Sequence, residues 1–501
     1  MFHTMPPLVR LLLTSPIALA MALPVVAQCA SSPSNLPWLL HGRIQVSKAN
    51  PHYLEYQDGT RFWWFADTAW ELPHRTTREQ VDLYLANRAK LGFNVIQAVA
   101  LGEFLKGKDT NAYGYKPLVD WNPLKPDLST PENYWTHLDY IVEAARKRGL
   151  YIALLPTWGE WVIPREGKPL FNTPEQAYGY GNFIGARYRN APNIIWILGG
   201  DRLPDERPNG IELWRAMAKG IADGVNGTYS LNGKTDYSTT LMTYHCFESS
   251  SKWFHNDPWI DFDTWGSYHA EFNNTRAFEQ ARHDWNLPSP RPFLDSEPCY
   301  EDALVNYAIP GNGHFKAVDV RIAAYWSVFS GACGFTYGAD AIWQFADAED
   351  PPLTKVTRDT WYNALAYDGA RQVIYLKNLL LSRPSDHLRP DQSLILKGAG
   401  EPAHSTVVLR GDSHLFAYIP TGNDLTLKLG VLTGKTLKAS WFNPRTGTSQ
   451  EIGLIPNEGE HTFQVPPMSS ELTWLRTGRG CDWVLVLDDD AKGYPAPGEA
   501  K

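Results

Sequence analysis

The stretch Trp196-Ile197-Leu198-Gly199-Gly200-Asp201 is a short apolar run that ends in two glycines and a carboxylate. A second stretch, Pro292-Phe293-Leu294-Asp295-Ser296-Glu297-Pro298, has the same form and ends in Glu297. Each pattern predicts a buried strand that delivers an acid where the chain turns into a loop. Two acids from two different strand ends are the minimal equipment for cleaving a glycosidic bond, provided that they face each other.

The sequence around these stretches repeats a short apolar run, a polar or aromatic loop and a segment of helical spacing. This alternation is typical of βα units around a parallel sheet, and eight such units predict a TIM (β/α)8 barrel. Because the carboxyl ends of all barrel strands face one crater, the fourth and seventh strands would bring Asp201 and Glu297 together. The predicted strands are 62–66, 95–99, 151–155, 194–198, 241–244, 262–265, 293–295 and 334–337, and the predicted helices are 77–91, 131–148, 174–188, 210–224 and 318–329.

A change of pattern marks a second domain. An apolar helix is expected over 361–381, and the chain then alternates with period two, as in Leu425-Thr426-Leu427-Lys428-Leu429, which predicts a small β-sandwich whose last strand is 483–487. The expected organisation is a signal peptide over 1–27, the barrel over 28–383, the sandwich over 384–490 and a flexible tail over 491–501. The long loop 101–129, rich in aromatic residues, is expected to form a wall of the substrate site.

The N-terminus predicts export. Arg10 precedes an apolar run over 11–26 that is too short for a good membrane span, and Val25-Val26-Ala27 provides the small residues that a signal peptidase reads. We therefore expect cleavage before Gln28, a secreted, extracellular protein and no membrane partner afterwards, with a lipid on Cys29 as the alternative. The formal charge of -8 offers no basic field for nucleic acid. We expect a monomer.

Five cysteines would remain after cleavage, so at least one stays unpaired in an oxidising compartment. We expect Cys29 to pair with Cys481 because chain termini often lie close together; the others are Cys246, Cys299 and Cys333. Two glycan acceptor triplets begin at Asn226 and Asn273.

The other predicted strand ends carry polar and aromatic groups, the mixture that sugar sites need for hydroxyls and ring faces. As substrate-binding candidates we take Asp67, Trp70, Trp158, Tyr244, His245, His269, Tyr300, Tyr337 and Trp343. No HExxH or CxxC spacing supports a metal centre, and no Gly-x-Ser-x-Gly elbow supports acyl transfer, so neither metal nor cofactor is expected.

Alternatives remain for both acids. Asp201 could cap the turn that follows it, and Glu297 could form a buried ion pair with Arg291 or Arg321. Asp295 shares a strand face with Glu297 and is its local rival, although Glu297 lies nearer the mouth. A retaining enzyme holds its carboxyls about 5–5.5 Å apart and an inverting one about 6.5–9.5 Å apart, a distance that sequence does not provide. Charge on one acid should raise the pKa of the other, so that one is the acid and the other the nucleophile.

Several motifs, taken in order, resemble a known family. They are Ala66-Asp67-Thr68-Ala69-Trp70, Gly199-Gly200-Asp201, Asp295-Ser296-Glu297-Pro298, Tyr325-Trp326-Ser327-Val328-Phe329-Ser330-Gly331-Ala332, Thr336-Tyr337-Gly338 and Ile342-Trp343-Gln344. The chain resembles glycoside hydrolase family 140, the apiosidase-like enzymes, in which a (β/α)8 domain precedes a β-sandwich named for collagen binding. The resemblance implies a retaining mechanism with Asp201 as acid/base and Glu297 as nucleophile. It also implies pectic oligosaccharides as substrate and apiose as the released sugar.

Three further readings stay open from the residues. The first is a glycosidase of the same fold with a different sugar specificity. The second is a catalytically silent carbohydrate-binding protein that keeps the aromatic crater. The third is an adhesin that acts through the sandwich.

Overall fold

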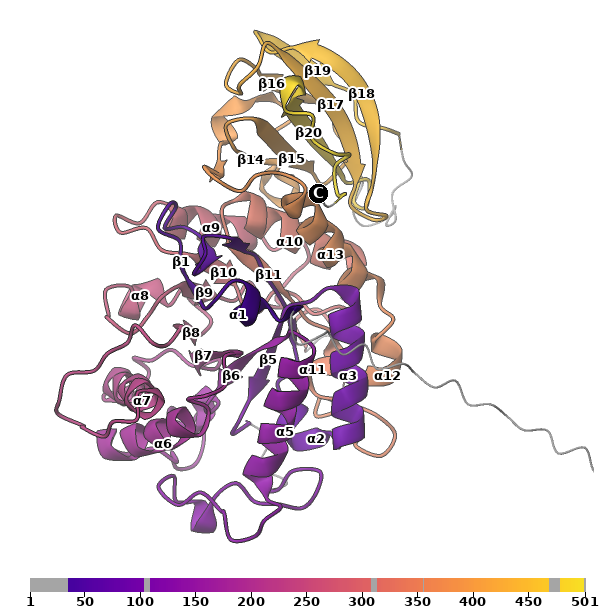
Figure 1. Cartoon of the computed structure of the whole chain (residues 1–501). Coiled ribbons are helices and arrows are strands. Elements are labelled where there is room, and N and C mark those ends of the chain that lie inside the picture. The colour runs from indigo at the N-terminus through magenta and orange to yellow at the C-terminus, as the bar shows by residue number, and fades with distance from the viewer. Residues whose placement is uncertain (1–34, 103–108, 308–312, 355, 468–477, 500–501) are drawn as a thin grey trace, which may run out of the picture.

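The barrel strands lie close to where the apolar runs predicted them. The computed structural model describes residues 35–102, 109–307, 313–354, 356–467 and 478–499. Within these residues eight parallel strands alternate with helices (Figure 1). The strands are β4 (Trp64–Thr68), β5 (Val95–Val99), β6 (Tyr151–Leu155), β7 (Ile194–Gly199), β8 (Met242–His245), β9 (Asp263–Trp265), β10 (Phe293–Asp295) and β11 (Gly334–Tyr337).

The ring of strands consists of two hydrogen-bonded sheets, which meet at two seams without regular pairing. One sheet has the strand order β11-β4-β5-β6-β7-β8, and the other pairs β9 with β10. At the first seam Thr243 Oγ1 donates to Phe262 O and Thr264 Oγ1 donates to Tyr244 O, each at 2.6 Å. At the second seam Cys333 N donates to Phe293 O at 2.9 Å. The barrel is therefore completed by hydroxyls and single backbone bonds where regular pairing stops.

Helices cover the outside of the ring, which explains why the strands read as unbroken apolar runs. Every residue of β5 and β6 is buried, as expected for parallel strands covered on both faces. The main covering helices are α3 (Arg78–Leu91), α5 (Tyr134–Lys147), α6 (Pro174–Arg187), α7 (Gly210–Val225), α9 (Arg276–Trp285), α10 (Ala317–Phe329) and α13 (Asp368–Leu381). Shorter helices are α1 (Pro37–Leu40), α2 (Leu72–Arg75), α8 (Ser251–Phe254), α11 (Asp340–Trp343) and α12 (Trp361–Ala364). Among the described residues, no helix combines the length and the apolar character that a bilayer crossing requires.

The single helix expected over 361–381 is wrong, because the chain forms α12 and α13 with a break between them. Tyr367 is extended at the break, and its hydroxyl donates to Asp359 at 2.7 Å. The new helix start is stabilised by Glu301, whose carboxylate accepts from Gly369 N at 3.0 Å. Apolar spacing continues across the break, so periodicity alone does not reveal it.

The sequence also did not predict a small antiparallel sheet before the barrel. It consists of β1 (Ile44–Val46), β2 (Leu54–Tyr56) and β3 (Arg61–Phe62), and β3 leads directly into β4.

The C-terminal domain consists of two antiparallel sheets, as the period-two pattern predicted. The larger has the order β12-β14-β15-β20-β17-β18 and the smaller the order β13-β16-β19. Their strands are β12 (Arg389–Pro390), β13 (Ile395–Lys397), β14 (Val407–Arg410), β15 (His414–Ile419), β16 (Leu425–Lys428), β17 (Thr436–Asn443), β18 (Thr448–Pro456), β19 (Glu460–Phe463) and β20 (Trp483–Asp489).

The larger sheet packs against the barrel as well as against the smaller sheet (Figure 1). Along β15, Leu415, Ala417 and Ile419 belong to the core of the sandwich. The alternate residues Phe416 and Tyr418 belong to the core of the barrel domain. Tyr418 stacks on Tyr325 of α10 with ring centroids 4.6 Å apart, so both faces of this strand are buried.

The segment after β20 differs from the flexible tail expected over 491–501. Tyr494 hydroxyl bonds Ser413 Oγ at 2.7 Å, and Gly498 N donates to Ser382 Oγ at 3.3 Å. These contacts tie the described part of the tail to both domains. The predicted signal peptide lies outside the described residues.

Of the cysteines, Cys246, Cys299 and Cys333 are buried free thiols. The predicted partner of Cys481, Cys29, lies outside the described residues. The side-chain amides of Asn226 and Asn273 donate to backbone carbonyls, and glycosylation there stays a prediction.

Candidate active site

Asp201 follows the end of β7, and the two residues before it have a backbone conformation that favours glycine. Gly199 and Gly200 have φ values of 91° and 124°, and Asp201 itself is left-handed at 51°. A Cβ on Gly199 would lie 2.2 Å from His245 O, and one on Gly200 would lie 2.7 Å from Trp158 Cδ2. Unfavourable backbone of this kind gathers at functional sites. The two glycines thus let the chain turn tightly enough to present the carboxylate.

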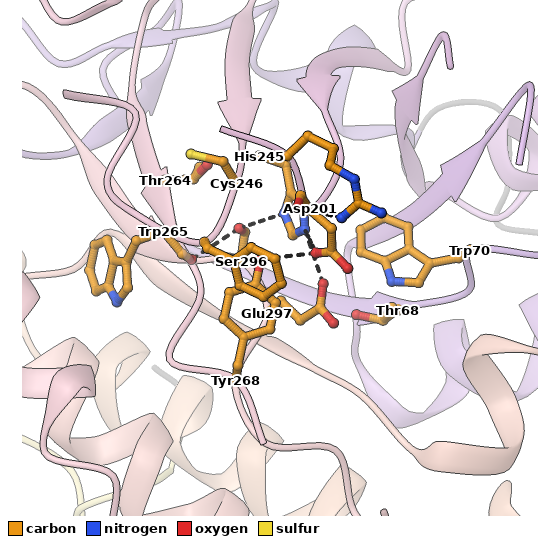
Figure 2. A network of polar contacts seen from close by, with 12 residues as sticks. Thr68, Trp70, Asp201, His245, Cys246, Thr264, Trp265, Tyr268, Ser296 and Glu297 are labelled. Carbon is orange, nitrogen blue, oxygen red and sulfur yellow. Dashed lines mark hydrogen bonds and ion pairs between the residues drawn. The ribbon is translucent and has the colours of Figure 1, made fainter. Parts of the chain in front are cut away.

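The carboxylate of Asp201 points into the crater, where Tyr268 hydroxyl donates to its Oδ1 at 3.1 Å (Figure 2). Tyr268 is itself left-handed, with a φ of 55°. The side chain of Asp201 is 25% exposed, which leaves it open to a ligand. The alternative that Asp201 merely caps a turn does not account for this placement.

Glu297, two residues beyond β10, is bound by two histidines. His245 Nε2 lies 3.0 Å from Glu297 Oε2, and His269 Nε2 lies 3.4 Å from Oε1. The alternative ion pairs are absent among the described residues, because Arg291 donates to Ile260 O and Arg321 pairs with Asp482. Glu297 is thus oriented by imidazoles rather than neutralised by an arginine.

His245, at the end of β8, approaches both acids with one ring nitrogen (Figure 2). Its Nε2 is 3.7 Å from Asp201 Oδ1, and its Nδ1 bonds Ser296 Oγ at 2.9 Å. Ser296 hydroxyl uses its proton to donate to Trp265 O at 3.1 Å, so His245 Nδ1 must donate to Ser296 Oγ. A proton on each ring nitrogen of His245 then satisfies all of these contacts. The network therefore favours an imidazolium next to the carboxyl groups of Asp201 and Glu297.

The electrostatics agree with this hydrogen-bond pattern. Burial alone would lower the pKa of His245, but its bonds to Asp201 and Glu297 outweigh burial and raise the pKa to about 9. Burial alone would raise the pKa of Glu297, but the two histidines outweigh it and hold the pKa well below its usual range. Glu297 is therefore a carboxylate at neutral pH.

The two acids are close enough to act on one atom. Ligand atoms of Asp201, His245 and Glu297 all lie within 4.8 Å of one another. Both acids line a cavity of about 720 Å³ at the carboxyl ends of the strands. A cavity of this size accommodates a small oligosaccharide.

Five of the predicted substrate-binding residues line this cavity: Trp70, Trp158, His269, Tyr300 and Trp343. Trp70 Nε1 donates to Tyr300 hydroxyl at 3.0 Å, and the rings of Trp70 and Trp158 lie 5.3 Å apart. His245 lies beneath the two acids and is fully buried, so it positions them rather than facing the cavity.

Asp67, Tyr244 and Tyr337 do not line the cavity, and their prediction as substrate contacts needs correction. Their side chains point outward from the strands to the helical layer. Asp67 accepts from Arg88 Nε at 2.5 Å, Tyr244 hydroxyl donates to Arg202 O at 3.2 Å, and Tyr337 hydroxyl donates to Glu301 at 2.7 Å. All three are fully buried and stabilise the barrel.

Asp295, the local rival of Glu297, is also turned away. Its carboxylate accepts from Ser267 N and Ser267 Oγ, and it is fully buried. Burial raises its pKa to about 6 despite these bonds. The described residues of the loop 101–129 do not line the cavity either, because Trp121 stacks instead on Trp161, with centroids 4.9 Å apart.

Several cavity residues were not predicted from sequence, namely Arg165, Arg202, Phe247, Arg276 and Tyr307. They lie on loops or at a helix start, where apolar periodicity carries no signal. Arg202 pairs with Glu160, and its Nη1 donates to Asp201 O at 2.9 Å. The adjacency of Arg202 to Asp201 was the one available hint.

The Asp201, His245 and Glu297 set also has the composition of a metal site. However, Nε2 of His245 faces an ionised carboxylate at 3.0 Å and so carries a proton there, whereas a metal ligand needs that lone pair. The protonation inferred from these contacts fits a charged hydrogen-bond network better than a metal centre.

A parallel barrel whose C-terminal crater holds two facing carboxylates among aromatic side chains is the architecture of a glycoside hydrolase. Residues 48–386 match the family model described as "Apiosidase-like, catalytic domain", and residues 389–488 match the one described as "Putative collagen-binding domain of a collagenase". The chain belongs to the apiosidase-like family, and the resemblance read from the ordered motifs is confirmed.

Solved structures agree with this assignment. A protein described as a glycoside hydrolase is 30% identical with a TM-score of 0.80, over 91% of this chain and 98% of that one. A glycoside hydrolase family 5 protein from Bacteroides vulgatus is 29% identical with a TM-score of 0.81, over 93% and 97% of the two chains. A search of the curated proteins finds no match.

Proposed function

We propose that this glycoside hydrolase acts with retention of configuration, with Glu297 as nucleophile and Asp201 as acid/base. The observation that carries the proposal is the approach of the two carboxylates within 4.8 Å across one cavity. Retaining enzymes separate these groups by about 5–5.5 Å, whereas inverting enzymes need about 6.5–9.5 Å to admit a water molecule. The separation here supports direct attack by a carboxylate.

The roles follow from the surroundings of each acid. Glu297 is ionised and fixed by two imidazoles, so its oxygen can attack the anomeric carbon while Asp201 gives a proton to the leaving oxygen. The glycosidic bond breaks, and an ester forms between the sugar and Glu297. A water molecule then gives its proton to Asp201 and attacks the anomeric carbon, which releases the sugar and restores both carboxyl groups.

Product stereochemistry tests the mechanism. We expect the first-formed sugar to have the anomeric configuration of the substrate, as followed by proton NMR from the first minutes of hydrolysis. Initial appearance of the opposite anomer would rule out the covalent route.

As substrate we propose pectic oligosaccharides, with apiose as the released sugar, acted on outside the cell after export. Membership of the apiosidase-like family supports this proposal, and the aromatic side chains of Trp70, Trp158 and Trp343 supply ring faces for sugars. A screen of pectin-derived oligosaccharides and aryl pentosides, with the released monosaccharides identified, tests it. Release of some other sugar alone would replace apiose but leave the chemistry in place.

The pH profile should reflect the lowered pKa of Glu297. The nucleophile must be ionised, and its pKa is below the usual range, so kcat/KM should persist below pH 4 instead of falling near an ordinary carboxyl pKa. In His245→Gln one positive charge is lost while burial remains, so the acid limb should move up by about one pH unit or more. If the acid limb of the pH profile does not move in His245→Gln, His245 does not control the charge on Glu297. Circular dichroism at each pH would check that the variant stays folded.

Chelation should have no effect on turnover. Because Asp201 supplies the proton transfers and Glu297 supplies the nucleophile, incubation with EDTA followed by gel filtration should leave kcat within about twofold of the untreated enzyme. A loss of activity that added Zn²⁺ or Ca²⁺ restores would instead assign Asp201, His245 and Glu297 to a metal.

A further inference from the structure

Asp295 is a buried carboxyl group that the proposed mechanism does not use. It is the last residue of β10, two positions before Glu297, and its side chain is fully buried. Burying a carboxyl group costs free energy unless hydrogen bonds replace those that it made to water. The partners of Asp295 therefore indicate which part of the molecule the group stabilises.

The carboxylate of Asp295 joins two turns. Ser267, two residues beyond the end of β9, donates to it from the backbone N at 3.1 Å and from the hydroxyl at 2.5 Å. The backbone N–H of Glu297 is also bonded to this carboxylate. One buried side chain thus holds together the turn after β9 and the turn that carries the nucleophile.

The turn after β9 carries Tyr268, whose backbone is left-handed with a φ of 55°. A residue other than glycine keeps this conformation only where the surrounding contacts enforce it. Tyr268 N donates to Glu297 O at 2.9 Å, and the ring packs against Phe247 with centroids 4.3 Å apart. The Tyr268 hydroxyl then reaches Asp201 Oδ1 (Figure 2). Tyr268 therefore connects the turn that Asp295 holds to the acid/base.

Resting on the proposed function, we propose that Asp295 is a positioning residue, which fixes the turn from which Tyr268 orients the carboxyl group of Asp201. Proton transfer to the leaving oxygen requires this carboxyl group within hydrogen-bond reach, and small displacements of a catalytic group slow such a step. Asp295 does not line the cavity, so it acts through Tyr268 and not on the sugar.

A double-mutant cycle tests this connection. Asp295→Asn keeps the size of the side chain but replaces one acceptor oxygen by an amide donor, so one of the two bonds from Ser267 is lost. Tyr268→Phe removes only the hydroxyl group that bonds Asp201. Each variant should lower kcat/KM by about tenfold for the oligosaccharide that the screen identifies. The double variant should be within about twofold of the slower single variant, because both changes remove the same function.

The leaving group provides a second measurement. Aryl glycosides with acidic phenols need little protonation, so both single variants should lose less than about threefold in kcat/KM on them. A residue that only stabilises the fold would lower kcat/KM equally for both kinds of substrate.

Asp284→Asn is the matched control. Asp284 of α9 is also a buried carboxylate that accepts from a serine hydroxyl, Ser249 Oγ at 2.8 Å, but it does not line the cavity. This variant should leave kcat/KM unchanged on both kinds of substrate, whatever its effect on the melting temperature.

Losses that multiply in the double variant, or a loss in Asp295→Asn that is equal for both kinds of substrate, would overturn the proposal. If circular dichroism shows that Asp295→Asn does not fold, Ser267→Ala takes its place, because it removes the hydroxyl bond to Asp295. The same outcomes then decide. The anomer of the released sugar reports on the proposed function alone, so retention together with multiplying losses would reject only the role of Asp295.

Discussion

Glu297→Gln should lower kcat by about 10⁴-fold or more while the fold is retained. The amide has nearly the same shape as the carboxylate but cannot form the glycosyl ester, and it keeps an oxygen that His245 can bond. Asp201→Asn should lower kcat by about 10²–10⁴-fold for sugars with poor leaving groups, since it removes the proton donor. For aryl glycosides with acidic phenols the loss should be smaller in the first step, because such leaving groups need little protonation.

Initial rates with natural oligosaccharides and aryl glycosides, together with circular dichroism of each variant, provide the measurement. Glu248→Gln is the matched control: it makes the same chemical change just after β8, on a side chain that pairs with Lys252 outside the cavity. It should leave kcat unchanged. Near-normal turnover in Glu297→Gln would refute the nucleophile, and no turnover in the wild type on any glycoside would favour a carbohydrate-binding protein.

Arg321→Gln should lower the free energy of unfolding by about 3–5 kcal/mol. Arg321 of α10 makes two bonds to Asp482 in the segment leading into β20, at 2.8 Å and 2.9 Å, and both residues are buried. Burial alone would raise the pKa of Asp482, but Arg321 and Arg445 outweigh it and lower the pKa. Without Arg321, the buried carboxylate of Asp482 would have Arg445 alone to offset the cost of removing its charge from water.

Thermal and urea unfolding would measure this effect, with Arg389→Gln as the control. Arg389 pairs with Asp412 at 3.1 Å, but both side chains are exposed, so its loss should cost less than about 1 kcal/mol. If both variants unfold at the same midpoint, the ion pair between the domains does not stabilise them. A stable interface also predicts that the sandwich stabilises the barrel.

The sequence predicted the barrel well because its strands are buried on both faces. Such strands read as compact apolar runs, and the runs at 95–99 and 151–155 coincide with β5 and β6. The break between α12 and α13 could not be predicted from periodicity, because it depends on Glu301, a residue from a distant loop. The contacts of the C-terminal tail depend in the same way on residues far along the chain.

At the site, the topology rule placed Asp201 and Glu297 on one crater, and the structure brings them together. The rule could not tell which side chains at a strand end point into the crater and which point toward the surrounding helices. Asp67 was therefore taken as a sugar contact although it faces α3, where Arg88 neutralises it. Arg276 was not predicted, since it belongs to a helix start whose position depends on the loop before it.

The central claim is that Glu297 becomes covalently bound to the sugar, and trapping that intermediate tests it most directly. A 2-deoxy-2-fluoro glycoside of the sugar released in the screen, with an activated phenol as leaving group, slows the second step so that the ester accumulates. Mass spectrometry should then show one added sugar per chain, located on the peptide that contains Glu297. Turnover without any labelled protein, or a label on a different carboxylate, would contradict the account.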